Sequence, residues 1–124
     1  MALRALIMDY GGVLTEPGML DLVERSHAAG RATALVSDAV AVPASCTVPF
    51  DLVVLGSSLG VRKPDPEVYR RVAHILGVGP QDCVVVDDLH VNLRGARAAG
   101  AVVVHNDDDP AATITEVEIL LGLS

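Results

Sequence analysis

The sequence predicts an α/β protein: five parallel strands in one doubly wound sheet, with helices on both faces, which makes a three-layer sandwich. Two observations predict this class. Short apolar segments alternate with segments of helical periodicity along the whole 124-residue chain, and this alternation is typical of βαβ units. The apolar segments are nearly unbroken, as in strands buried on both faces of a sheet. The length suits a single domain, residues 1–124.

The expected elements follow one another in strand–helix order. The five apolar segments predict strands at 3–8, 32–36, 51–55, 83–87 and 101–105. Helical spacing predicts helices at 19–29, 66–76 and 89–99, and a glycine ends each of them. A last helix is expected to begin near Thr113, where Thr-Ile-Thr-Glu fits a capping box. Residues 39–49 are expected to form a loop with at most one short turn, and residues 107–110 a solvated turn.

Composition narrows the classes of partner. The net charge is −7, which argues against nucleic acid and against anionic membrane surfaces. No apolar run approaches the roughly 20 residues of a membrane span. The N-terminal residues do not have the pattern of a signal peptide, and two cysteines are too few for a disulfide scaffold. These observations predict a cytoplasmic protein that binds neither nucleic acid nor membrane.

Polar residues follow the predicted strands at their carboxyl ends. Asp9 follows the first strand, Ser37 the second, and the pair Asp87 and Asp88 comes at the end of the fourth, while Lys63 lies in the loop before the second helix. In an open α/β sheet the ligand crevice lies at this edge, so these groups are expected to converge there.

The chemistry of this set favours phosphate and a metal. Carboxylates packed together repel one another unless a cation lies among them, and Mg²⁺ is the usual ion beside phosphate. Lys63 is a compact positive charge for a phosphoryl oxygen or for the Asp9 carboxylate, and Ser37 offers a hydroxyl. Gly11 and Gly12 allow a tight turn whose amides point at a phosphate.

Four segments together resemble the haloacid dehalogenase-like (HAD) hydrolase superfamily. They are Met-Asp-Tyr-Gly-Gly-Val-Leu at 8–14, Leu-Val-Ser-Asp at 35–38, Gly-Val-Arg-Lys-Pro-Asp-Pro-Glu-Val-Tyr at 60–69 and Val-Val-Val-Asp-Asp-Leu-His-Val-Asn at 84–92. The resemblance covers essentially the whole chain and implies a Rossmann-like core. It also implies a Mg²⁺-dependent phosphatase, in which an aspartate attacks the phosphoryl group and forms an aspartyl-phosphate that water hydrolyses.

The resemblance implies a role for each site residue. The catalytic residues are the nucleophile Asp9 and the charge-stabilising Lys63. The phosphate is held by Ser37, Asp38, Gly11, Gly12 and Lys63. The Mg²⁺ ligands are Asp9, the backbone carbonyl of Gly11, Asp87 and Asp88. Asn92 occupies the position of a residue that orients these ligands.

The chain departs from the family pattern in two places. Gly11 stands where family phosphatases usually carry a second aspartate, the general acid and base. Only 27 residues separate Asp9 from Ser37, too few for a helical cap. An uncapped crevice suits a phosphorylated small molecule or a phosphoprotein, and the apolar surface that a missing cap leaves suits a homodimer.

Three other functions remain as alternatives. A catalytically weak or inactive domain that serves as a binding or interaction protein fits both departures. A phospho-acceptor receiver domain uses similar groups, but it places its acidic pair at the first strand, whereas the pair here is at the fourth. A dehalogenase requires a dry halide pocket, which a chain without a cap does not provide.

Overall fold

The computed structural model describes residues 2–123 and contains one parallel sheet of five strands in the order β3-β2-β1-β4-β5. The fold class predicted from the sequence is therefore confirmed. The strands are β1 (Ala5–Met8), β2 (Ala32–Ser37), β3 (Leu52–Leu55), β4 (Cys83–Asp87) and β5 (Val102–His105). The first strand begins two residues later than predicted, at Ala5.

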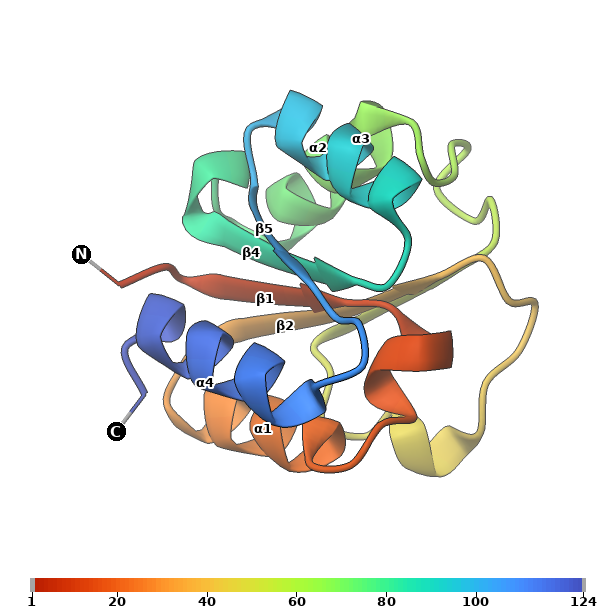
Figure 1. Ribbon diagram of the computed structural model, residues 1–124. Helices are drawn as coiled ribbons and strands as arrows, with labels where there is room; N and C mark the ends of the chain where they lie inside the picture. The colour runs from red at the N-terminus through yellow and green to blue at the C-terminus, as the bar shows by residue number, and fades with distance from the viewer. Residues whose placement is uncertain (1, 124) are drawn as a thin grey trace.

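Four α-helices cover the sheet, two on each face (Figure 1). Helices α2 and α3 lie on one face, and α1 and α4 lie on the other. Their bounds are α1 (Met19–Ala28), α2 (Pro66–Leu76), α3 (His90–Ala99) and α4 (Pro110–Leu121). Three short helical turns complete the fold: η1 (Tyr10–Leu14), η2 (Ala44–Cys46) and η3 (Pro80–Asp82).

The core has two halves, one on each face of the sheet. Because side chains alternate along a strand, Leu6 and Met8 of β1 pack toward α1 and α4, while Ala5 and Ile7 pack toward α2 and α3. All four side chains are buried. Burial on both faces explains why the strand segments are continuously apolar in the sequence.

The register places the ends of β1 and β4 side by side. Met8 pairs with Leu35 of β2 on one side and with Val86 of β4 on the other. The next residues, Asp9 and Asp87, therefore emerge together at the carboxyl edge. The chain runs from β1 outward through β2 to β3 and then returns to the other side of β1. This reversal is the topological switch point at which open α/β sheets bind ligands.

The last helix begins earlier than predicted, at Pro110 rather than near Thr113. Asp109 is its N-cap, and the Asp109 carboxylate accepts a hydrogen bond from the Ala112 amide at 3.1 Å. Proline is favoured at the first helical position. The Thr113 hydroxyl instead donates to the Asn106 side chain at 2.8 Å. The capping-box interpretation was therefore wrong, because the acidic turn itself caps the helix.

The segment between β1 and β2 forms only η1 and α1 in this structure, and α1 packs beside α4 on the sheet. No cap domain is found among residues 2–123. The two ends of the described chain meet at the opposite edge from Asp9, where the Leu3 amide donates to the Leu120 carbonyl at 2.8 Å. Within the same residues, none of the helices combines the length and the apolar character needed to cross a bilayer.

Candidate active site

Asp9 opens the site at the end of β1, followed by the η1 turn. Gly12 in this turn has a φ of +72°, a conformation that side chains disfavour. A Cβ on Gly12 would also collide with the Asp88 carboxylate. The turn thus brings the backbone against the acidic pair from β4, and only glycine allows this approach.

Gly11 is in a different situation. Its φ is −65° and its ψ is 131°, which any residue adopts. A Cβ built on Gly11 would have nothing within 4 Å. Neither conformation nor space requires glycine here, so the structure would accept a larger side chain at this position.

Lys63 is the central cation of the site. Its ammonium Nζ donates to Asp9 Oδ1 at 2.9 Å and to Asp87 Oδ2 at 3.0 Å. The Lys63 side chain is only 3% exposed, although it comes from the loop before α2. An ammonium this deep is stable only when it is paired, and here two carboxylates pair with it.

Asp87 is held by several donors. Its Oδ2 accepts from Asn92 Nδ2 at 3.1 Å as well as from Lys63, and its Oδ1 accepts from the Leu89 amide at 3.0 Å. Its side chain is 1% exposed. These contacts fix the carboxylate in one orientation.

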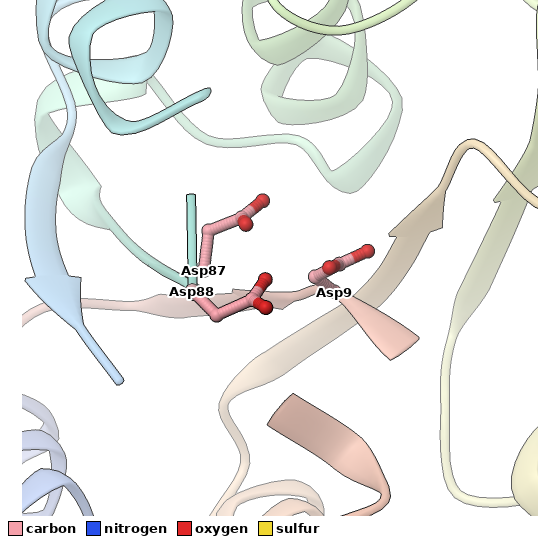
Figure 2. Close-up of side chains that lie close together, drawn as sticks. All are labelled: Asp9, Asp87 and Asp88. Carbon is pink, nitrogen blue, oxygen red and sulfur yellow. The ribbon is translucent and has the colours of Figure 1, made fainter. Parts of the chain in front are cut away.

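Three carboxylates converge at this edge (Figure 2). Asp9, Asp87 and Asp88 each offer an oxygen, and these oxygens lie within 4.8 Å of one another. Lys63 is the one positive charge in contact with this group of three carboxyl groups, so their full ionisation would leave the cluster with excess negative charge. An oxygen-rich, negatively charged set of this kind fits a hard divalent cation such as Mg²⁺.

Burial is the main cause of the pKa shifts of the carboxyl groups at this site. Burial raises the pKa of the Asp9 carboxyl, and the attraction of Lys63 only partly opposes the rise. Burial also raises the pKa of Asp88, and a hydrogen bond with Asp87 adds to the shift. For Lys63, burial alone would lower the pKa, but Asp9 and Asp87 together outweigh it, so the pKa is raised. The site therefore favours positive charge.

A small crevice of about 250 Å³ opens over this cluster. Ser37 is buried at the end of β2, and its hydroxyl accepts a hydrogen bond from the Ala39 amide at 3.2 Å. The Asp38 side chain is half exposed, and its Oδ1 lies 3.8 Å from Arg62 Nε. The residues that line the crevice are Asp9, Tyr10, Gly11, Ser37, Asp38, Ala39, Lys63, Leu89 and Asn92. The structure thus brings the residues predicted from the sequence to one place. Asp87 and Asp88 do not line the crevice but form an acidic cluster with Asp9, which does. Gly12 lies against Asp88.

Sequence reasoning missed two residues that shape the site. Asn106 follows β5, is 1% exposed, and donates from Nδ2 to the Gly12 carbonyl at 2.8 Å. Gly95 lies inside α3, and a Cβ there would collide with the Pro64 carbonyl, so glycine lets α3 pack against the segment that carries Lys63. The sequence did contain a signal for Gly95, because a glycine inside a helical segment often has a packing role. No local pattern identified Asn106.

Fold and site together define an α/β protein with an acidic, lysine-containing crevice at the switch point of a parallel sheet. Residues 17–100 match the family of haloacid dehalogenase-like hydrolases, and the chain belongs to this family. The predicted family is thereby confirmed.

Three similar proteins illustrate the relationship. An uncharacterized protein from Corynebacterium glutamicum has a crystal structure with a TM-score of 0.85 and 29% identity, covering 99% of this chain and 98% of that one. Protein CbbY of Rhodobacter capsulatus is 32% identical over 79% of this chain and 48% of its own length. Glyceraldehyde 3-phosphate phosphatase of Methanopyrus kandleri is 38% identical over 48% of this chain and 31% of its own. The chain spans about half of CbbY and under a third of the phosphatase.

Proposed function

We propose that this protein is a Mg²⁺-dependent phosphatase that acts through an aspartyl-phosphate on Asp9. The observation that carries the proposal is the Asp9 carboxylate, held by a buried Lys63 at 2.9 Å within a cluster of three carboxylates beneath a crevice. The similarity to a phosphatase supports the choice of phosphate as the group transferred.

The donor set supports Mg²⁺ as the cofactor. Asp9, Asp87, Asp88 and the backbone carbonyl of Gly11 would hold the ion, because carboxylate and carbonyl oxygens are its preferred protein ligands. When bound, the ion neutralises charge on the phosphoryl oxygens and lets an anionic nucleophile approach an anionic substrate. Burial is the main cause of the raised pKa values of Asp9 and Asp88, and a bound cation would favour the ionised forms of both groups.

The protein's own groups carry the remaining chemistry. The Ser37 hydroxyl, the Lys63 ammonium and the backbone amides of Gly11 and Gly12 bind the phosphoryl oxygens. A carboxylate oxygen of Asp9 attacks phosphorus, the bond from phosphorus to the leaving oxygen breaks, and the leaving group departs as an oxyanion that takes a proton from solvent water to become the alcohol. Water then attacks the phosphorus of the aspartyl-phosphate, which releases phosphate and restores Asp9. Asn92 keeps Asp87 oriented throughout.

Gly11 limits the choice of substrate. Without a carboxyl group at this position, the turn offers no carboxylic acid to protonate the departing oxygen, so we expect a preference for good leaving groups such as acyl phosphates. The open crevice suits a phosphorylated small molecule or a phosphoprotein, and a second copy of the chain is a further candidate partner. We expect the reaction to take place in the cytoplasm.

The test is hydrolysis of para-nitrophenyl phosphate and acetyl phosphate by the purified protein, with and without Mg²⁺. Asp9→Asn is the control, because it keeps the size of the side chain and removes the nucleophile. Turnover that needs both Mg²⁺ and Asp9 is expected. Mg²⁺ binding without any turnover would instead favour the alternative, a domain that binds a phosphorylated partner, and Gly11 is the observation behind that alternative.

A further inference from the structure

A second hollow lies on the other side of α3 from the crevice. It encloses about 570 Å³ between α3 and β5, more than twice the volume of the crevice. Leu89 and Asn92 of the α3 segment border the crevice, whereas other residues of α3 border the hollow. Its lining residues are His90, Leu93, Arg94, Arg97, Val103 and His105.

The polar lining of this hollow is basic. It contains two arginines and two histidines and no carboxylate, in a chain whose net charge is −7. A general excess of basic residues does not explain such a hollow. Arg94 and Arg97 are three residues apart on α3, so their side chains are neighbours on the helix surface.

The two arginines also lack partners, unlike most basic residues of the chain. Among the arginines and lysines, five side chains lie within 4.0 Å of a carboxylate, and a sixth, Arg31, donates to backbone carbonyls: the five are Arg25, Arg62, Lys63, Arg70 and Arg71. Across residues 2–123, Arg94 and Arg97 have neither a carboxylate within that distance nor a hydrogen-bond acceptor, and Arg4 is the other arginine in this condition. Each guanidinium carries five N–H donors, and both of these partnerless side chains border the hollow.

The two histidines of the lining, His90 and His105, stack on each other. The rings of His90 and His105 stack with their centroids 4.0 Å apart, and His105 Nε2 lies 3.0 Å from the Asp88 carbonyl oxygen. Since a carbonyl only accepts, Nε2 carries the hydrogen of that bond.

We propose that the hollow between α3 and β5 is a second anion site, which binds a phosphate-type dianion through Arg94 and Arg97. Guanidinium groups match the paired oxygens of such an anion and bind it with two parallel hydrogen bonds. The anion has two candidate sources. It is either a second phosphate group on the substrate, an assignment that rests on the proposed function, or a separate inorganic phosphate.

The binding test is a titration with inorganic phosphate at constant ionic strength, followed by the NMR signals of the ¹⁵N-labelled protein. Signals from α3 and β5 report the hollow, and signals of Gly11, Gly12 and Ser37 report the crevice. Arg94→Gln with Arg97→Gln removes the guanidinium groups and keeps a helix-forming side chain. Arg4→Gln with Arg70→Gln is the matched control, because it removes the same charge from exposed positions elsewhere.

We expect saturable shifts at the hollow whose apparent phosphate affinity falls at least tenfold in the Arg94/Arg97 variant and stays unchanged in the control. The response of the crevice signals to phosphate should be the same in both variants. Shifts that do not saturate, or that weaken equally in both variants, would show general electrostatic attraction and overturn the proposal.

Inhibition of para-nitrophenyl phosphate hydrolysis separates the two sources. If the hollow takes a second substrate phosphate, butane-1,4-diol bisphosphate inhibits at least tenfold more tightly than butyl phosphate, and the Arg94/Arg97 variant loses this advantage. If it takes a separate phosphate, the two compounds inhibit alike while the shifts at the hollow remain. A protein without turnover would contradict the proposed function, and the titration would still decide the anion site.

Discussion

The side-chain amide of Asn106 donates a hydrogen bond to the carbonyl oxygen of Gly12 at 2.8 Å, joining the end of β5 to the turn that follows Asp9. The backbone amide of Asn106 donates to the Asp87 carbonyl at 3.0 Å, and its Oδ1 accepts from Thr113. One buried residue thus holds the turn, the end of β4 and α4 together.

Asn106→Ala is therefore expected to lower the stability and disturb the site. Losing the donor to Gly12 leaves a carbonyl without its partner, at a cost of about 1–3 kcal/mol in the free energy of unfolding. Thr113→Val is the control, because it breaks only the bond to α4. Urea unfolding and Mg²⁺ titration of both variants provide the check. Equal Mg²⁺ affinity in the two variants would show that the bond to Gly12 does not position the site.

Gly11→Asp is expected to increase the rate on substrates with poor leaving groups. The backbone at Gly11 is ordinary and the space beside it is open, so the new side chain fits without strain. A positioned acid contributes about 10²–10⁴-fold, and the gain should be large for alkyl phosphates and small for acetyl phosphate. Gly11→Asn has the same shape without the titrating proton. Steady-state rates that rise equally in both variants would contradict an acid–base role.

The contrast between the glycines shows what the sequence could and could not predict. Asp9 and Asp87 were placed correctly because apolar strand segments fix the carboxyl edge. The need for glycine at position 12 but not at position 11 depends on φ and on Asp88, which lies far along the chain. The contact of Asn106 with Gly12 likewise joins residues that only tertiary structure brings together. The start of α4 was misplaced because the acidic turn reads as solvated, although Asp109 caps the helix.

Lys63→Met is expected to be strongly destabilising at neutral pH. Removing the ammonium leaves Asp9 and Asp87 buried without their cation, and breaking a buried pair costs about 3–5 kcal/mol. The loss should shrink as the pH falls, because Asp9, whose pKa is raised by burial, then becomes protonated and no longer leaves an uncompensated charge. Arg70→Met, which breaks an exposed pair with Glu67, should cost at most about 1 kcal/mol. A loss for Lys63→Met that is small or independent of pH in urea unfolding would argue against the buried pairing.

Mg²⁺ should raise the melting temperature, and the effect should grow with pH. The folded metal-free protein holds protons on Asp9 and Asp88 more tightly than the unfolded chain, because both pKa values are raised. The stability contributed by these groups therefore falls as the pH rises above about 3.8 through their folded-state pKa values. Mg²⁺ competes with those protons, so its stabilisation should be smaller at pH 4 than at pH 7.

Thermal melts with and without Mg²⁺ across this range test the pH dependence. Asp88→Asn is the control, because it removes one charged carboxylate from the proposed ligands. The melting temperature of this variant should respond weakly to Mg²⁺ at every pH. A stabilisation by Mg²⁺ that is the same at pH 4 and pH 7 would show that the ion binds elsewhere.

The hydrogen bond between Leu3 and Leu120 places both ends of the described chain next to each other, on the side of the sheet where β1 begins, whereas the crevice lies at the carboxyl ends of the strands. Anything joined to either end, whether a neighbouring domain, an affinity tag or a surface linker, would leave the molecule on its far side. Protein immobilised or fused through either end would thus keep its crevice open to solvent. The points of attachment and the crevice thus lie on opposite sides of the protein.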